Sequence, residues 1–239
     1  QRSQTTAFIA KATWCDLTHI VRWRASLRKV LRMDARTAKL WAAQDRHVGD
    51  RQRLFETVSR SIDANKVLYP GCYVDIAPSM VFDDVTYVDN DKRFPKFFDD
   101  EDGVREIIDA QRDTSKYKFR AIHADYTSDL DIRDRSVDLL ISLYAGFVSE
   151  HCTRHLKVGG SLLVNASHGD ASMASIDARY ELTGVLTSRD SNYIFATTNL
   201  ASYFMPKKDE DVTIDRLHEL GRGVPYKKSA FAYLFTRTS

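Results

Sequence analysis

The sequence predicts an α/β protein built on a doubly wound, mostly parallel seven-stranded sheet with an N-terminal helical extension. Three observations lead to this fold class. Short β-branched runs recur from position 66 onward, stretches with helical periodicity separate them, and positions 1–65 contain no proline and only one glycine, Gly49. Strands that alternate with helices indicate a parallel sheet with right-handed crossovers. The 239 residues suffice to bury a full core.

Composition narrows the class of protein further. Apolar residues make up 43% and charged residues 28% of the chain, which is ordinary for a globular protein. No run approaches the roughly 18 apolar residues that a membrane span needs. The three cysteines, Cys15, Cys72 and Cys152, are odd in number and lack CxxC spacing, which disfavours a disulfide framework or a zinc ribbon. We therefore expect a cytoplasmic protein without a membrane partner.

Residues 1–65 are predicted to form a helical cap, and residues 66–239 the main domain. Three aspartates are spaced to cap successive helices: Asp16, Asp34 and Asp50. Positions 1–60 hold 13 Lys and Arg against 5 Asp and Glu. Such a surplus fits an anionic partner such as RNA, although solvated arginines on helices explain it equally simply.

The expected elements of the main domain follow from local patterns. Five runs are expected as parallel strands: 67–69, 85–89, 119–125, 137–144 and 161–166. Three later runs are expected as further strands: 180–188, 192–197 and 230–236. Helices are expected at 79–82, 101–111, 147–156 and 211–220, with Gly159 and Gly160 as the stop of the third.

A glycine turn and an acid point to a nucleotide-like ligand. Gly71 follows the first β run, and Asp89 ends the second run. In α/β nucleotide-binding domains a glycine lets the backbone approach the ligand, and an acid about 20 residues on receives the ribose hydroxyls. The spacing of Gly71 and Asp89 is close to this, so the pair predicts an adenosine-type cofactor.

Between about Lys66 and Arg237 the chain resembles the class I S-adenosylmethionine-dependent methyltransferases, whose fold is Rossmann-like. Five alternating β/α units followed by antiparallel strands follow the order of that family. Residues 67–71 resemble its motif I, 85–89 its second strand with the ribose-binding acid, 123–126 its adenine-binding segment, 136–142 its motif IV and 156–164 its L-x-x-G-G-x-L run. The family usually has three glycines in motif I, whereas here only Gly71 stands, followed by Cys72, Tyr73 and Val74.

The resemblance implies S-adenosylmethionine as the cofactor. It assigns the ribose to Asp89, the adenine edge to Asp125 and Tyr126, and the methionine end to residues 71–75. The complete set of expected cofactor-binding residues is Tyr69, Gly71, Cys72, Asp75, Asp89, Asn90, Asp125, Tyr126 and Ser142.

Two segments at strand ends carry candidate chemistry. Tyr144 follows the fourth run and could stack on a substrate, or simply pack as a core aromatic. His168 follows the fifth run and could act as a general base oriented by Asp170. Helix capping by Asp170 and an ordinary loop histidine are the structural alternative. The proline motifs typical of DNA-base methylation are absent from the fourth segment.

No metal site is expected. His151 and His155 are spaced i, i+4 on a predicted helix, but neither an HExxH motif nor a cysteine pair accompanies them.

The sequence thus predicts a methyltransferase that acts on a small molecule. Two alternatives stay open: an RNA methyltransferase that uses the basic N-terminal helices, and a non-catalytic cofactor-binding or interaction module with a decayed motif I.

Overall fold

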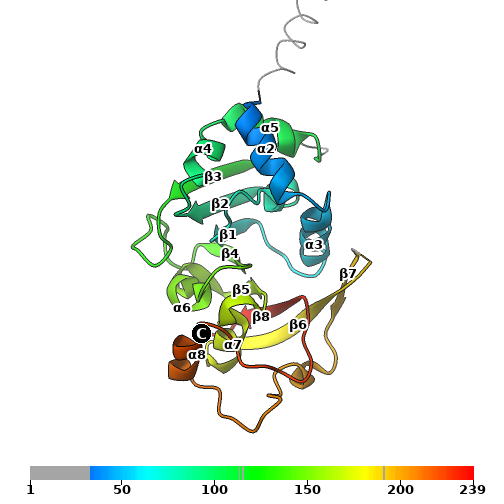
Figure 1. Cartoon of the computed structure of the whole chain (residues 1–239), viewed down its shortest axis with the longest axis vertical. Helices are drawn as coiled ribbons and strands as arrows, with labels where there is room; N and C mark the ends of the chain where they lie inside the picture. Colours follow the sequence, from blue (N-terminus) through cyan, green and yellow to red (C-terminus); the bar gives the residue numbers. More distant parts are fainter. Residues whose placement is uncertain (1–32, 113, 115, 191) are drawn as a thin grey trace, which may run out of the picture.

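The computed structural model describes residues 33–112, 114, 116–190 and 192–239 of the chain (Figure 1). Its centre is one sheet with the strand order β3-β2-β1-β4-β5-β8-β6-β7. The strands are β1 Lys66–Pro70, β2 Asp84–Asp89, β3 Lys118–His123, β4 Val137–Ser142, β5 Leu156–Val164, β6 Tyr180–Arg189, β7 Asn192–Ala196 and β8 Ala232–Arg237. No helix within the described ranges is long and apolar enough to cross a membrane.

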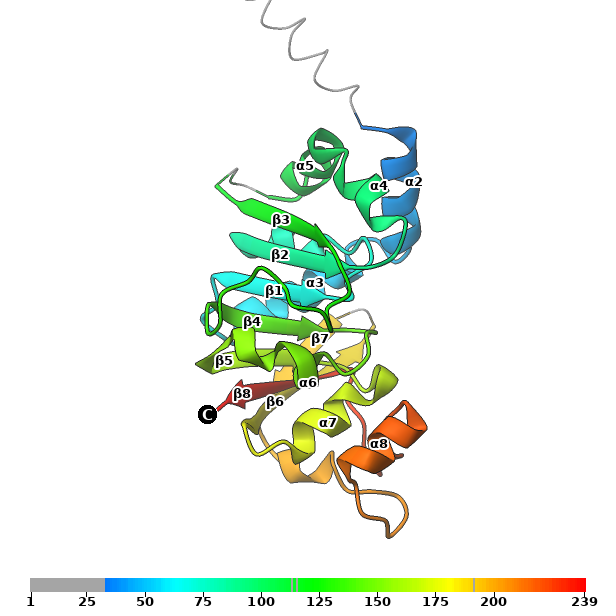
Figure 2. The same ribbon diagram turned by 90° about the vertical axis from the view of Figure 1, so that its left-hand side faces the viewer.

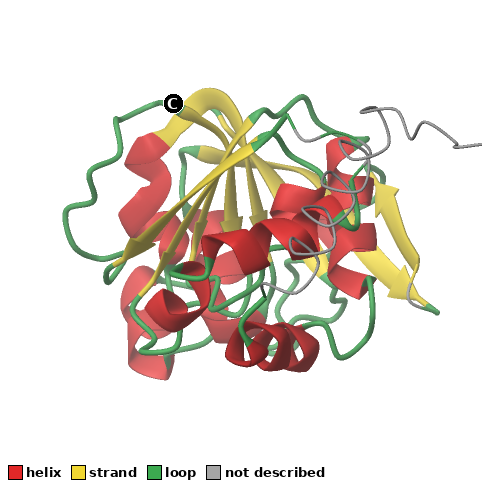
Figure 3. Ribbon diagram, turned by 90° about the horizontal axis from the view of Figure 1, so that it is seen from above, coloured by secondary structure: helices red, strands yellow, loops and turns green. Residues whose placement is uncertain are grey.

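The first five strands are parallel, and β8, β6 and β7 continue the sheet in antiparallel fashion. This confirms the predicted doubly wound, mostly parallel sheet. The sheet has eight strands where seven were expected, and each of the eight runs named from the sequence overlaps one of them, β7 at the edge included. Figure 2 shows the same strand order from the side, and Figure 3 shows how the strands fan around one another, as twisted sheets do.

Helices flank the sheet in the order of the chain. The α-helices are α2 Ala35–Gln44, α3 Asp50–Ser59, α4 Phe94–Phe98, α5 Glu101–Asp109, α6 Val148–Cys152, α7 Asp170–Ile176 and α8 Ile214–Leu220. The 3-10 helices are η1 Ala77–Met80, η2 Thr153–His155, η3 Ser167–Gly169 and η4 Leu200–Ser202. Among the described residues the β3–β4 connection, 124–136, contains no helix.

Two apolar cores lie on opposite faces of the sheet, because successive strand residues point to opposite sides. Tyr69 and Tyr87 belong to one core, which also receives Leu54, Phe55 and Val58 from α3. The other core holds alternate strand residues with α6 and α7. Burying each of these large side chains contributes about 1.5–3 kcal/mol. Helix α3, from the predicted cap, thus shares one core with the strands.

Of the predicted helix caps within the described residues, one forms and one does not. Asp34 caps α2, since its carboxylate accepts a hydrogen bond from the Arg36 backbone N–H at 2.7 Å. Asp50 does not cap α3. It is the first residue of that helix, and the cap position belongs to Gly49, whose φ of 71° suits glycine. Asp16 lies outside the described residues.

The predicted helix stop at Gly159 and Gly160 is wrong. The chain is helical only through α6 and η2, and both glycines lie inside β5. The pairing of β4 with β5 shifts register between Val137 and Leu139, as at a β-bulge. Gly159 has a φ of 83° there, a conformation that only glycine adopts easily.

Candidate functional site

The strand order reverses between β1 and β4, and ligands of doubly wound sheets bind beyond the carboxyl ends of the strands at such a point. Gly71 follows β1 with a φ of 65°, and a Cβ atom placed on it would lie 2.5 Å from the Ala145 Cβ. The loops after β1 and β4 therefore touch, and this contact requires a glycine.

Asp89, at the end of β2, binds the loop that follows β1. Its Oδ2 accepts a hydrogen bond from the Tyr73 backbone N–H at 2.6 Å, and its Oδ1 accepts one from the Asp91 N–H at 2.7 Å. The Arg93 guanidinium lies 4.6 Å from the centre of the Tyr73 ring. Each carboxylate oxygen has a second lone pair and can accept a further hydrogen bond. Asp89 is partly exposed and so could receive the ribose hydroxyls.

Asn90 and Asp125 meet beside Asp89 at the ends of β2 and β3. The Asn90 side-chain amide donates to the Asp125 carboxylate at 3.0 Å. Hydrogen bonds from the backbone N–H and hydroxyl of Thr127 lower the pKa of Asp125. Tyr126 follows on, half-buried, and a Cβ on Gly146 would lie 2.6 Å from its hydroxyl oxygen. The ends of β2, β3 and β4 thus converge at one edge.

Four predicted cofactor residues lie beneath this edge instead of on its surface. Tyr69, Cys72, Asp75 and Ser142 are each at most 2% exposed. The Tyr69 hydroxyl donates to Asp75 at 3.2 Å, and the Cys72 thiol lies 3.8 Å from the Val88 carbonyl oxygen. Burial raises the pKa of the Cys72 thiol well above its usual range, which does not suit a reactive thiolate.

Asp75 is bound to a residue that the sequence reasoning missed, Arg51 of α3. The Arg51 Nε lies 3.3 Å from the Asp75 Oδ2, and its guanidinium lies 5.0 Å from the centre of the Tyr144 ring. Asp75 is fully buried, and this burial raises its pKa although Arg51 opposes the shift. Leu54 and Val58, at i+3 and i+7 from Arg51, both face the core. This helical spacing is the signal that could have identified Arg51.

Within the described part of the chain, Arg51 has a hydrogen-bond donor without an acceptor. Its Nη1 atom is buried and has no hydrogen-bond partner among the described residues. Buried polar groups almost always have a partner, so such an atom calls for an explanation.

Tyr144 is exposed at this edge, as Asn90 and Asp125 are. Its side chain is 52% exposed and its φ of 60° lies in the left-handed region, which is unusual for a bulky residue. The predicted alternative, a core aromatic, is wrong for Tyr144, because its own side chain is exposed. The buried residues are its neighbours Leu143 and Ala145.

The predicted pairing of His168 with Asp170 does not form. The Asp170 carboxylate is buried and accepts hydrogen bonds from the Ser142 and Ser149 hydroxyls and from the Ser149 backbone N–H at 3.1 Å. Burial raises the pKa of Asp170 to about 6. His168 is exposed, and its Nδ1 lies 2.7 Å from the Ser167 hydroxyl. The cap of α7 is Gly169, so Asp170 joins β4 to α6 instead of capping.

The described residues contain no group of three or more His, Cys, Asp or Glu side chains placed to hold a metal ion. His155 is buried and accepts a hydrogen bond from Arg154, while His151 lies on the surface beside Glu150.

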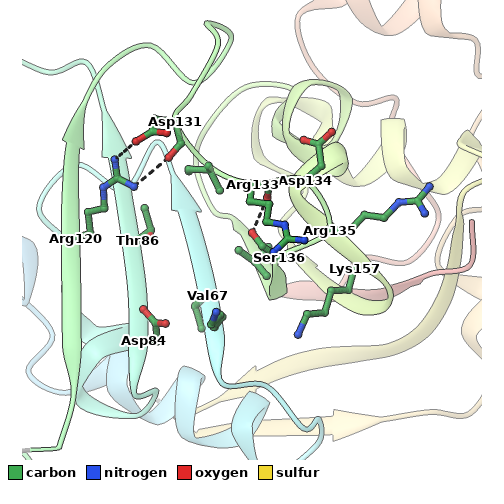
Figure 4. Close-up of a pocket in the computed structure, with 13 residues that line it drawn as sticks. Val67, Asp84, Thr86, Arg120, Asp131, Arg133, Asp134, Arg135, Ser136 and Lys157 are labelled. Atoms are coloured by element: carbon green, nitrogen blue, oxygen red, sulfur yellow. Dashed lines mark hydrogen bonds and ion pairs between the residues drawn. The ribbon is translucent and has the colours of Figure 1, made fainter.

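Two cavities lie at opposite ends of the parallel strands. The smaller, of about 240 Å³, lies by α3 at the carboxyl ends and is lined by Gln44, Asp45, His47, Asp50, Arg51, Tyr144 and Phe231. The larger, of about 690 Å³, lies near the amino ends, under the helix-free β3–β4 connection (Figure 4). Charged side chains line it, among them Arg120 with its partner Asp131.

Comparison with known proteins gives fold neighbours only. No family model matches the chain, and no curated protein does either. A protein from Methanococcus maripaludis assigned as an S-adenosyl-L-methionine-dependent methyltransferase is 18% identical, with a TM-score of 0.40 over 54% of this chain and 61% of that one. The [4+2]-cyclase SpnF is 19% identical, with a TM-score of 0.36 over 48% of this chain and 44% of that one. A SAM-dependent methyltransferase from Thermotoga maritima is 9% identical, with a TM-score of 0.46 over 84% and 97%.

The alignment thus spans about three fifths of the first of these proteins and less than half of the second. At these TM-scores the likenesses carry no argument of their own. The strand order itself, five parallel strands followed by antiparallel pairs, agrees with the order expected from the sequence.

Proposed function

We propose that the chain is an S-adenosylmethionine-dependent methyltransferase that acts on a small molecule. The observation that carries the proposal is the acid at the end of β2 bound to the glycine turn after β1: Asp89 accepts the Tyr73 N–H at 2.6 Å. Because the turn after β1 borders the point where the strand order reverses, and Asp89 holds that turn from the neighbouring β2, the pair fits the ribose and the adjoining part of an adenosine cofactor.

The residues at this edge carry hydrogen-bonding groups and charges that match those of the cofactor. Asp89 would accept the ribose hydroxyls, while Asn90, Asp125 and Tyr126 would meet the adenine edge. The unpartnered donor of Arg51 fits an acidic group of the ligand. Bound S-adenosylmethionine supplies an electrophilic methyl group on a sulfonium.

The contribution of the chain to catalysis would be positioning. In-line displacement needs the acceptor atom held at the methyl carbon, and holding it there can supply a large part of the rate enhancement. Tyr144 borders both the cavity of about 240 Å³ and the loop contact at Gly71, so its exposed ring could orient an acceptor. His168, with an exposed imidazole after β5, stays the candidate general base. Asp170 would support the site by joining the end of β4 to α6 through its buried hydrogen bonds.

Calorimetric titration tests the cofactor proposal. We expect saturable binding of S-adenosylmethionine and S-adenosylhomocysteine by the wild type. The Asp89→Asn variant should bind roughly 10- to 100-fold more weakly, since hydrogen bonds to a charged group are among the stronger ones. The matched control is Asp99→Asn, because Asp99 is an exposed acid outside this edge. Equal affinity for wild type and Asp89→Asn would contradict the proposal.

A second candidate is a non-catalytic binding module. It is favoured by the contact of the β1 and β4 loops at Gly71 and Ala145 and by the small cavity beside them. The cavity of about 240 Å³ is smaller than most ligand pockets, which usually measure about 300–1,000 Å³. Incubation with S-adenosylmethionine and a panel of small amines, phenols and thiols separates the two candidates. Binding without release of S-adenosylhomocysteine would favour the module.

The RNA alternative stays a prediction. The basic and aromatic residues that suggest it all lie outside the described part of the chain: Arg22, Arg24, Arg28, Lys29 and Arg32 beside Trp14 and Trp23. Binding to RNA that weakens steeply with added salt would favour it over a small-molecule substrate.

A further inference from the structure

Arg51 joins the two loops that border the proposed cofactor site. It extends from the first turn of α3, meets Asp75 in the segment after β1 and covers the ring of Tyr144 in the segment after β4. Only 15% of its side chain is exposed. A guanidinium placed between these two loops lies where the strand order reverses.

The hydrogen bonds of Arg51 are incomplete. Its Nε faces Asp75, whereas the buried Nη1 has no hydrogen-bond partner among the residues described. A guanidinium presents several N–H donors in a fixed fork and matches a carboxylate in shape and charge. An unmet donor in this position therefore points to an acidic group of a ligand.

Asp75 is poorly placed to take up a ligand ammonium group. It is buried, it faces Arg51, and it accepts hydrogen bonds from the Tyr69 hydroxyl at 3.2 Å and the Ala77 N–H at 3.2 Å. Two other carboxylates, Asp45 and Asp50, line the same cavity as Arg51. One cation with an unmet donor and two nearby acids suit a ligand that carries both a carboxylate and an ammonium.

We propose that Arg51 binds the carboxylate of the methionine part of the cofactor and that the Tyr144 ring covers Arg51 until the ligand enters. This inference rests on the proposed function and assigns to this chain a cofactor anchor outside motif I. Tyr144 suits the covering role because its ring is half-exposed, and its φ of 60° stores backbone strain of the kind found at ligand clamps.

Two ligands that differ only in the amino-acid part provide the test. S-adenosylhomocysteine carries the carboxylate, and 5′-methylthioadenosine lacks it. We expect the Arg51→Lys variant to bind S-adenosylhomocysteine roughly tenfold more weakly or worse, because a lysine loses the forked donor. Its affinity for 5′-methylthioadenosine should stay unchanged. The control Arg60→Lys, at an exposed position just after the same helix, should alter neither affinity.

Folding of the variants must be separated from binding. Arg51→Lys keeps a cation beside the buried Asp75, and the double variant Arg51→Met/Asp75→Asn removes both charges together. The melting temperature of each variant is measured beside its affinities. A selective loss for S-adenosylhomocysteine in both variants supports the inference.

The outcomes are distinct. An unchanged affinity ratio of the two ligands in both variants would overturn the role of Arg51 while leaving the proposed function standing. An equal loss for both ligands would also overturn it, since the effect would then be structural. Failure of the wild type to bind either ligand would overturn the proposed function together with this inference.

Discussion

The two ends of the parallel strands differ in how their polar groups are held. At the carboxyl ends Asp75 and Asp170 are buried and Asp89 is partly so, and all three are bound by backbone N–H groups or neighbouring side chains. At the amino ends Arg120 and Asp131 form an exposed ion pair, with side chains 53% and 96% exposed. Asp138 of β4 is partly buried there and accepts the Asn65 and Lys66 backbone N–H groups at 3.1 and 2.8 Å.

The larger cavity does not lie at the end of the strands that holds the buried carboxylates Asp75 and Asp170. The cavity at the amino ends measures about 690 Å³ and that at the carboxyl ends about 240 Å³. The larger one is lined in part by the β3–β4 connection, whose described residues form no helix (Figure 4). Exposed pairs contribute little to stability, whereas buried carboxylates must be held precisely or cost several kcal/mol. The proposed site therefore rests on the buried carboxylates of the carboxyl ends and not on cavity volume.

The largest expected effect comes from the contact between the loops after β1 and β4. Gly71→Ala should destabilise the fold by about 2–4 kcal/mol, because the φ of 65° disfavours a side chain and the new Cβ would lie 2.5 Å from that of Ala145. The matched control is Gly221→Ala, whose φ is 59° with nothing within 4 Å of the added atom. It should cost only about 1 kcal/mol. Urea denaturation measures both, and equal losses would show that the loops do not press together.

Asp170 provides the next test. Burial raises its pKa to about 6 in the folded chain, against 3.8 for an ordinary carboxyl group. The folded state therefore keeps this proton to higher pH than the unfolded state, and stability should fall as the pH rises from about 4 to about 6. The contribution reaches at most about 3 kcal/mol.

The Asp170→Asn variant removes the titrating group and keeps its shape. The difference in unfolding free energy between wild type and this variant should change across pH 4–6 and be constant above. Asp99→Asn, a substitution of an exposed acid, should show no such change. A flat difference for Asp170→Asn would mean that burial does not raise the pKa of Asp170 in the folded chain.

Much of the fold could be predicted because the signals are local. The run 85–89 is β-branched and ends in an acid, and the structure forms β2 there with Tyr87 and Val88 buried. The glycine at 71 marks a turn whatever surrounds it. Local signals also mislead: Gly159 and Gly160 read as a helix stop, yet a shift in the β4–β5 register puts them inside a strand.

The site could be predicted only in part, because its contacts join segments far apart in sequence. Asp170 meets Ser142 and Ser149, which are 28 and 21 residues away, so adjacency to His168 gave the wrong partner. Arg51 lies in a helix that the sequence assigns to a cap, and no local pattern tells which strand ends it will face. The acids at the ends of β2 and β3 were easier to find, since parallel strands bring their carboxyl ends to one edge.

The smallest effect is expected at the amino ends. The Arg120–Asp131 pair joins two well-exposed side chains at 3.0 Å, and such pairs contribute about 0–1 kcal/mol. Asp131→Asn should thus lower the unfolding free energy only within this range, and a high salt concentration should remove most of the difference by screening. Cofactor affinity should not change, because this residue lies at the opposite end of the strands from Asp89. A loss of several kcal/mol that persists in salt, as expected when a buried pair is broken, would show that the amino ends are built as firmly as the carboxyl ends.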